Sequence, residues 1–319
     1  MNNIPPRGLM AELVTPLDRE GRADAPVLAG LFQRLKKYCQ GFLVGGFRVG
    51  EGLWLSPDER LGLLAAAMEY CRDGPVVFFE IACRAAEETE DLLNRAEKLI
   101  HGEAFAKATV FFHLTPLVYH GNRDLPTHFK ALCRLSRRPF VLGNNPGLVG
   151  TLRSRLRHRN IQAAVLEKMA GEDHLVGLAA DGDLSLSLAY QRALGERPGF
   201  RFYDGCETAF LDRPSSSGLI SSGVQVLPRP WSSIVEASLG PFNHNTLQAD
   251  FLGEIWESGR RVRGLGASVR PNPPALVKAA LARLGVIPNP AVKPGRPPAS
   301  SADLARLHAF LDEVGPDRP

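Results

Sequence analysis

Leu175-Val176-Gly177-Leu178-Ala179-Ala180 is a short apolar run with the length of a buried β-strand, and Asp181 follows it directly. Runs of this kind recur along the chain and alternate with amphipathic stretches of helical periodicity. The eight candidate strands span residues 9–15, 42–46, 76–82, 108–114, 140–144, 175–180, 200–204 and 218–221. Strands that alternate with helical crossovers form parallel sheets. Eight such units predict an α/β fold, the closed (β/α)8 TIM barrel.

Helix signals and the end of the strand pattern indicate how the chain is organised. Ser56-Pro57-Asp58-Glu59 combines an N-cap hydroxyl, a proline suited to the first turn and a glutamate that reaches back to the cap. Asp24-Ala25-Pro26 indicates a similar helix start. After about Trp231 the strand signals stop, and helices are expected at residues 246–263, 274–284 and 301–314. We therefore expect a barrel over residues 1–230 and a C-terminal helical region over residues 231–319.

Composition is that of an ordinary globular protein. The 319 residues are 44% hydrophobic and 23% charged, enough for one large domain with a smaller appendage. The formal net charge is +4, and the aromatic residues are not interleaved with basic ones, which argues against a nucleic-acid partner. No apolar run approaches about 18 residues and the start lacks signal-peptide features, so no membrane partner is expected. Five cysteines without a C-x-x-C pair favour a reducing, cytoplasmic location.

A series of short motifs occurs in a definite order along nearly the whole chain. The series comprises LMAELVT at residues 9–15, Pro16-Leu17-Asp18, Gly21, Gly50-Glu51, Leu55-Ser56, Leu114-Thr115-Pro116, His128-Phe129-Lys130, Asn144-Asn145-Pro146, Gly150, Gly177-Leu178, Gly218-Leu219-Ile220-Ser221, Asn272-Pro273 and Val277-Lys278. In this order the motifs resemble the dihydrodipicolinate synthase and N-acetylneuraminate lyase family of pyruvate-handling aldolases and lyases. The resemblance implies a barrel with a small helical C-terminal region, assembled as a homodimer or homotetramer.

Several positions where that family places its catalytic groups differ in this chain. Ala179 stands where the resemblance implies the lysine that attacks a ketone, and a methyl group cannot form an imine. Gly143 and Val118 stand at the positions of two tyrosines, and Leu148 at that of an arginine. The loop implied to hold the substrate carboxylate reads Phe47-Arg48-Val49-Gly50-Glu51, without its two hydroxyls. We expect no Schiff base, no cofactor and no genuine dihydrodipicolinate synthase activity.

New polar residues occur near the predicted strand ends, where TIM barrels carry their functional groups. Glu12 or Glu80 close to His113 would form a general acid and base pair, each setting the pKa of the other. Arg48 offers a planar guanidinium for a small-molecule carboxylate. The predicted catalytic residues are Glu80, His113 and Glu12, and the predicted substrate-binding residues are Arg48, Val49, Gly50, Glu51, Asn144, Ala179, Asp181 and Ser221.

Each of these interpretations has a structural alternative. A single histidine on a strand is more often a hydrogen-bonded core residue than a catalytic one, and Glu12 and Glu80 could serve only to neutralise Arg48. No recognised ligand spacing supports a metal, so none is expected. Cys206 follows a predicted strand and could be a nucleophile, although free cysteines usually serve as buried packing.

Two functions therefore remain open. The first is a lyase that cleaves carbon–carbon or carbon–oxygen bonds of a small keto or hydroxy acid by acid–base chemistry, without an imine. The second is a catalytically inactive binding or regulatory protein that keeps the barrel. Inward-facing ionisable residues are costly unless they are used or paired, which favours the enzyme.

Overall fold

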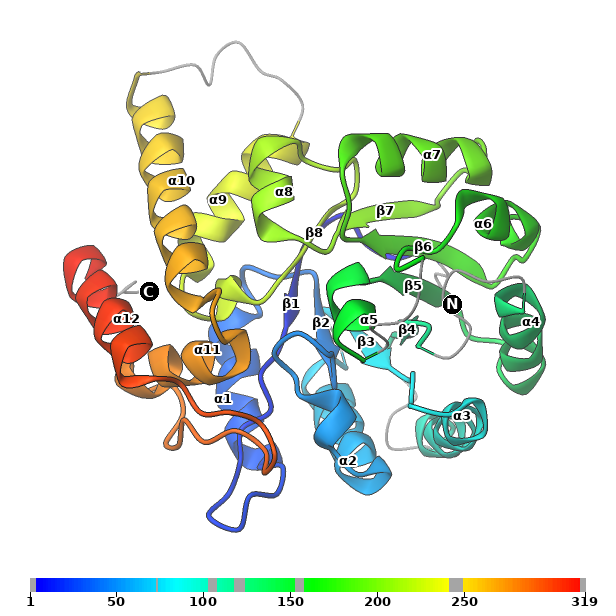
Figure 1. Cartoon of the computed structure of the whole chain (residues 1–319), viewed down its shortest axis with the longest axis horizontal. Coiled ribbons are helices and arrows are strands. Elements are labelled where there is room, and N and C mark those ends of the chain that lie inside the picture. The colour runs from blue at the N-terminus through cyan, green and yellow to red at the C-terminus, as the bar shows by residue number, and fades with distance from the viewer. Residues whose placement is uncertain are drawn as a thin grey trace.

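The barrel is closed and its strands follow chain order. The computed structural model describes residues 4–72, 74–102, 108–117, 124–152, 158–240 and 249–315. Its eight strands are all parallel, and the last pairs with the first (Figure 1). The strands are β1 (Gly8–Glu12), β2 (Gly41–Val44), β3 (Val76–Glu80), β4 (Val110–Leu114), β5 (Phe140–Asn144), β6 (Leu175–Ala180), β7 (Arg201–Asp204) and β8 (Gly218–Ser221). The predicted (β/α)8 TIM barrel is confirmed.

Helices surround the barrel and continue beyond it. The described α-helices are α1 (Ala25–Leu35), α2 (Pro57–Tyr70), α3 (Ala86–Ile100), α4 (Leu125–Leu135), α5 (Pro146–Leu152), α6 (Ala163–Met169), α7 (Leu184–Leu194), α8 (Glu207–Asp212), α9 (Pro228–Leu239), α10 (Ala249–Val269), α11 (Pro273–Arg283) and α12 (Ser301–Val314). In Figure 1 the yellow to red helices α10, α11 and α12 lie together on one side of the barrel. The predicted domain boundary at residue 230 falls inside α9, which packs against β1 and β8.

The helix starts follow the local chemistry of the sequence. The Ser56 hydroxyl accepts a hydrogen bond from the Glu59 amide, and the Glu59 carboxylate accepts one from the Ser56 amide. This reciprocal pair satisfies two amides that a helix end leaves without partners, so α2 begins at Pro57 as predicted. Asp24 caps α1 in the simpler way, through the Val27 amide.

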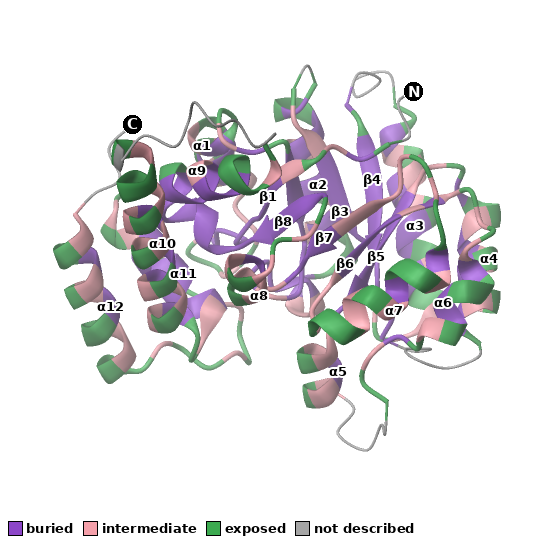
Figure 2. Ribbon diagram, turned by 90° about the horizontal axis from the view of Figure 1, so that it is seen from above, coloured by how far each residue is buried: buried purple, intermediate pink, exposed green. Residues whose placement is uncertain are grey.

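Two apolar layers hold the barrel together. The outer layer lies between strands and helices, and Figure 2 shows it as the buried purple inner faces of helices whose outer faces are green. The inner layer fills the barrel itself. Its members are Met10, Leu43, Phe78, Phe111, Val141, Ala179, Tyr203 and Ile220. Residues two apart on a strand face the same side. Glu80 therefore faces inward like Phe78, and His113 faces inward like Phe111. The inner apolar layer thus lies directly beneath a polar layer at the carboxyl ends of the strands.

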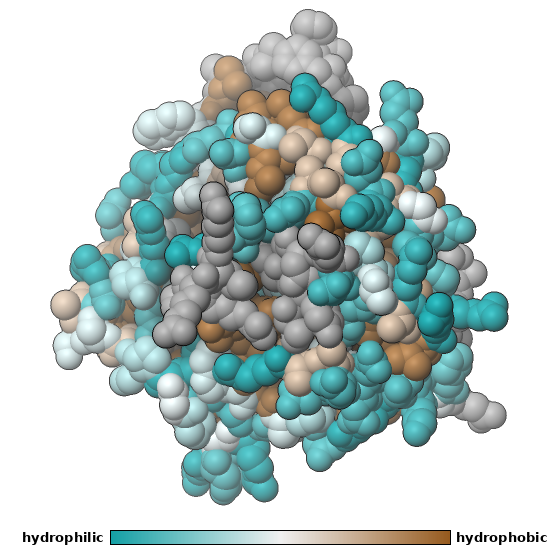
Figure 3. All heavy atoms as spheres, turned by 45° about the vertical axis from the view of Figure 1, so that its right-hand side comes forward, coloured by the Kyte–Doolittle hydropathy of each residue, from teal (hydrophilic) through white to brown (hydrophobic). Residues whose placement is uncertain are grey.

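The face of the molecule drawn in Figure 3 is mainly polar. Figure 3 shows one face on which hydrophilic side chains predominate and apolar ones form only small patches. Among the described residues, no helix combines the length and the apolar character needed to cross a bilayer.

Candidate functional site

A small cavity lies at the carboxyl ends of the strands. Its volume is about 40 Å³, room for about three water-sized groups at about 10–15 Å³ each. Glu12, Glu80, His113 and Ala179 line it from β1, β3, β4 and β6, and Arg48 lines it from the loop after β2. This is the end of the barrel at which TIM-barrel enzymes carry out their chemistry.

Glu80 is a buried carboxylate with a full set of donors. The β3–β4 register places it directly beside His113, and its Oε2 lies 2.8 Å from His113 Nδ1. The Thr115 hydroxyl donates to Oε2 at 2.7 Å, and the amides of Ala82 and Thr115 donate to Oε1 at 3.0 and 3.1 Å. Burial by itself raises the pKa of Glu80, but His113 and these hydrogen bonds outweigh it and hold the pKa below its usual value. Glu80 is therefore ionised at neutral pH.

His113 presents one free ring nitrogen. Because the Glu80 carboxylate can only accept, neutral His113 carries its proton on Nδ1 and directs an unprotonated Nε2 elsewhere. Nε2 is buried and has no hydrogen-bond partner among the described residues, and His113 lines the cavity. A buried nitrogen without a partner is costly, so it marks a position where a ligand or water would bind.

Gly143 makes room for this histidine. A Cβ atom at residue 143 would lie 2.7 Å from His113 Cε1 and 2.5 Å from the Thr115 hydroxyl. The ring of His113 and any larger side chain at position 143 therefore exclude one another. Gly143 and His113 are thus parts of one arrangement.

Arg60, which was not predicted as a site residue, supports the same strand. It extends from α2, is only 2% exposed, and donates to the carbonyl oxygens of Glu80 and Ala82. Burial lowers the pKa of Arg60, with Cys83 and Glu80 opposing this effect.

Thr115 was also not predicted as a site residue, although its position just after β4 in the Leu-Thr-Pro motif would have allowed it.

Arg48 is bound to Asp181 across the cavity. Its Nη2 lies 3.0 Å from both oxygens of the Asp181 carboxylate, and both side chains remain about a quarter exposed. Burial by itself would lower the pKa of Arg48, but Asp181 and Glu12 outweigh burial and raise it. The guanidinium stays charged, and its remaining N–H groups are the donors it can offer a ligand.

Glu12, predicted as catalytic, contacts the loop after β2. Its Oε1 accepts hydrogen bonds from the Arg48 amide at 2.7 Å and the Val49 amide at 3.0 Å. Glu12 lines the cavity together with the Glu80 and His113 pair, but its carboxylate accepts hydrogen bonds from the loop. The Val49 amide is thus engaged by this chain and not open to a substrate.

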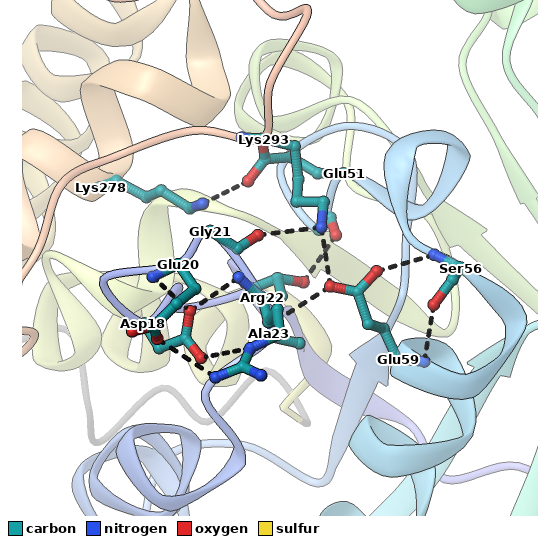
Figure 4. Close-up of polar contacts among 12 residues, drawn as sticks. Asp18, Glu20, Gly21, Arg22, Ala23, Glu51, Ser56, Glu59, Lys278 and Lys293 are labelled. Atoms are coloured by element: carbon teal, nitrogen blue, oxygen red, sulfur yellow. Dashed lines mark hydrogen bonds and ion pairs between the residues drawn. The ribbon is translucent and has the colours of Figure 1, made fainter.

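Glu51 points away from the cavity. Figure 4 shows its carboxylate directed to Lys278 and Lys293 of the C-terminal region. Lys278 and Glu51 form an ion pair in which both side chains are fully buried, and the Lys293 amide donates to Glu51 at 2.8 Å. Gly50 belongs to the same loop, and its carbonyl accepts a hydrogen bond from the Thr15 hydroxyl at 2.7 Å. The structure does not bring Gly50 and Glu51 to the cavity.

The other predicted binding residues differ in their surroundings. Ala179 and Asn144 line the cavity, but the Asn144 side chain is bound to Asn160, Ile161 and the carbonyl of Asp181. Ser221 donates to Glu207 at 2.7 Å, outside the lining. Val118 lies outside the described residues. Within the described parts of the chain, no group of three potential metal ligands is present.

Asp204, at the end of β7, gives the stability of the protein a measurable pH dependence. Burial raises its pKa to about 6, although hydrogen bonds with Ser215 oppose this. Between its ordinary pKa of 3.8 and a pKa of about 6, folded Asp204 keeps a proton that the unfolded residue has lost. The contribution of Asp204 to stability therefore decreases as the pH rises through this range. Between pH 4 and 7 we expect the unfolding free energy of the natural protein to fall by about 2 kcal/mol relative to Asp204→Asn. Urea titrations of both proteins across this range measure the difference, and parallel pH curves would contradict it.

A larger cavity lies at the opposite end of the barrel. It measures about 380 Å³ and lies between the start of β1 and α9. Two of the polar side chains that line it are paired: Gln40 accepts from the Leu9 amide, and Ser232 donates to Glu236. Residues at the amino ends of barrel strands serve stability rather than chemistry. The smaller cavity, with its unpartnered nitrogen, is therefore the candidate site.

The Dihydrodipicolinate synthetase family model matches residues 5–313, almost the whole chain. The chain belongs to this family. Among relatives, the 4-hydroxy-tetrahydrodipicolinate synthase of Sphingopyxis alaskensis is 26% identical over 97% of this chain and 98% of its own length. That of Kineococcus radiotolerans is 25% identical over 96% and 92%.

Solved structures of the same family share the fold. A dihydrodipicolinate synthase from Bacillus anthracis superimposes with a TM-score of 0.79 at 18% identity, covering 98% of this chain and 99% of that one. The enzyme from Aquifex aeolicus gives 0.79 at 19% identity, covering 97% and 98%. The resemblance drawn from the ordered motifs is thereby confirmed at the level of family and fold.

Proposed function

We propose that the protein is a lyase that acts on a small keto or hydroxy acid through the Glu80–His113 pair, without an imine. The observation that carries this proposal is the unpartnered, buried Nε2 of His113, held toward the cavity by an ionised carboxylate at Nδ1. Carboxylate–imidazole pairs of this kind act as general bases because the carboxylate fixes the tautomer and stabilises the imidazolium that forms.

The chemical step needs only a proton acceptor and a positive charge. His113 Nε2 takes a proton from a hydroxyl or from a carbon beside a carbonyl, and Glu80 stabilises the resulting imidazolium. The N–H groups of Arg48 that Asp181 does not use meet the negative charge that develops on the substrate oxygen. In a hydroxy keto acid, loss of the hydroxyl proton breaks the adjacent carbon–carbon bond, whose electron pair forms the enolate of the keto acid fragment, and the imidazolium gives the proton to the enolate carbon. In an elimination, the electron pair left on carbon by proton abstraction forms a double bond while the hydroxyl leaves as water with the proton of the imidazolium.

The surroundings of the lysines support chemistry without an imine. None of the described residues that line the cavity is a lysine, and Ala179 faces inward on β6. Lys278 is bound to Glu51, and Lys293 donates to Glu59 at 2.7 Å. A lysine that forms an imine needs a free, unprotonated amine within reach of the carbonyl.

A binding or regulatory protein without turnover is the second candidate. The observations that favour it are the small volume of the cavity and the internal pairing of Arg48 with Asp181. Ligand binding would then occur with no proton exchange and no dependence on His113 beyond local contact.

Borohydride treatment with pyruvate tests the first proposal. Reduction converts an imine into a stable secondary amine, so intact mass spectrometry would detect it on any lysine. We expect the unmodified mass, together with exchange of deuterium from D2O into some members of a panel of small keto and hydroxy acids, followed by NMR. A mass increase equal to a reduced pyruvate adduct would contradict the proposal, and binding of the panel without exchange would favour the second candidate.

The assembly and location of the protein remain predictions. The homodimer or homotetramer implied by the resemblance has some support from Leu252 and Trp256, which are exposed one turn apart on α10. The cytoplasmic location rests on the cysteine pattern alone.

A further inference from the structure

The loop after β2 forms an anion site that the chain itself fills. Two successive amides, those of Arg48 and Val49, converge on one carboxylate oxygen, Glu12 Oε1. Successive backbone N–H groups that point to one centre are a recurring anion-binding arrangement in proteins. Here the anion is a side chain of the neighbouring strand.

This arrangement is built around the Glu12 carboxylate. A Cβ atom at Gly46 would lie 2.6 Å from Glu12 Oε1 and 2.8 Å from its Cδ, so the carboxylate occupies space that only a glycine leaves open. Glu12 is 4% exposed and lies in the β1–β2 ladder opposite Leu43. The carboxylate is thus fixed at the amides by both strand register and packing.

The amide pair is held in place from its other side as well. Thr15 donates to the Gly50 carbonyl, and Glu51 is tied to Lys278 and to the Lys293 amide. The backbone of Glu51 is left-handed, with φ 57°, a conformation that a non-glycine residue keeps only where its surroundings enforce it. These contacts do not involve Glu12, so the amides should keep their positions when its side chain is removed.

The charged side chains around the cavity also disfavour a ligand carboxylate at the loop amides. Glu12, Glu80 and Asp181 contribute three carboxylates, against one guanidinium from Arg48. A ligand carboxylate brought to the amides would have to displace Glu12 and approach two further negative charges.

We propose that Glu12 is a specificity-determining residue that closes the amide site to ligand carboxylates. A ligand therefore enters the cavity with an uncharged carbonyl or hydroxyl end, and any carboxylate it carries lies at the Arg48 side chain and not at the loop amides. This inference refines the substrate class of the proposed function, but it concerns binding alone. Its test does not depend on turnover.

Small carboxylates should bind the amides of Arg48 and Val49 in a variant that lacks the Glu12 carboxylate. In Glu12→Ala the two amides lose their acceptor, and acetate or pyruvate can take its place. We expect acetate and pyruvate to raise the melting temperature of Glu12→Ala and to bind it about tenfold or more tighter than they bind the natural protein. Calorimetric titration gives the affinities, with chloride at equal ionic strength as the reference.

Two control variants separate the site from general effects. Glu20→Ala removes an exposed glutamate and should respond to acetate as the natural protein does. Glu12→Gln keeps an oxygen that accepts from both amides, so it should stay closed to acetate. Equal acetate affinity in Glu12→Ala and the natural protein would overturn the proposal, while the acid–base proposal for His113 would stand.

A measurement on the natural protein tests the proposal even if Glu12→Ala does not fold. We expect pyruvate to leave the NMR resonances of the Arg48 and Val49 amides unchanged at concentrations that shift resonances elsewhere in the cavity. Large shifts of both amides, with Glu12 displaced, would overturn the proposal without any substitution.

Discussion

Lys278→Met is expected to lower the unfolding free energy by about 3–5 kcal/mol, the cost of leaving a buried charge without its partner. Lys278 and Glu51 are both fully buried, and the Lys278 ammonium also donates to the Ala291 carbonyl at 2.9 Å. Burial lowers the pKa of Lys278, although Glu51 opposes this effect. Methionine has a similar length but no charge, so the Glu51 carboxylate loses the ammonium and keeps the hydrogen bond from the Lys293 amide. Denaturant titration measures the loss.

Two further variants show whether the loss comes from the buried charge. Lys130→Ala breaks an exposed pair with Glu172 and should cost no more than about 1 kcal/mol. In the double variant Glu51→Gln with Lys278→Met no charge is left unpaired, so part of the stability should return. If Lys278→Met cost no more than Lys130→Ala, the loop would not depend on this pair.

The strands could be predicted from the sequence because each is a compact apolar run. The ranges for β5, β6 and β8 match the structure, whereas β1 and β3 were predicted to extend to Thr15 and Ala82. The chain leaves the sheet after Glu12 and Glu80, but the residues that follow stay buried at the mouth of the barrel. Apolar character therefore continues past the last strand residue, and composition cannot show where hydrogen bonding stops.

The long helix α10 was predicted to end near Arg263, but it continues to Val269. Leu265 and Val269 extend its buried stripe. Gly264 does not break the helix, because its missing side chain lets Phe310 of α12 approach: a Cβ atom there would lie 2.5 Å from the phenylalanine ring. This contact joins parts of the chain that are distant in sequence, so the residues around Gly264 do not indicate that the helix continues.

The site could be predicted as a set of positions but not as a set of partners. Strand ends in a barrel converge, so Glu12, Glu80 and His113 were expected near one another, and all three line the cavity. Which group each would contact depends on strand register and loop shape. The register pairs Glu80 with His113, while the loop after β2 turns its amides toward Glu12. The pairing of Arg48 with Asp181 likewise joins two loops 133 residues apart.

His113→Ala is expected to lower the rate of proton exchange by a factor of about 10² to 10⁴, the usual contribution of a positioned general base. Alanine removes Nε2 and leaves the Glu80 carboxylate with its three other donors, so Glu80 stays in place. Glu80→Gln should also slow exchange, because a neutral amide does not stabilise the imidazolium. His101→Ala, at an exposed histidine outside the site, is the matched control.

The exchange rate of His113→Ala relative to the natural protein shows whether His113 is the group that removes the proton. Deuterium incorporation from D2O is followed by NMR at one pH, with the keto or hydroxy acid that the natural protein exchanges fastest. We expect the rate to fall at least about a hundredfold in His113→Ala and to stay unchanged in His101→Ala. A correctly folded His113→Ala protein that exchanges deuterium as fast as the natural one would contradict this expectation.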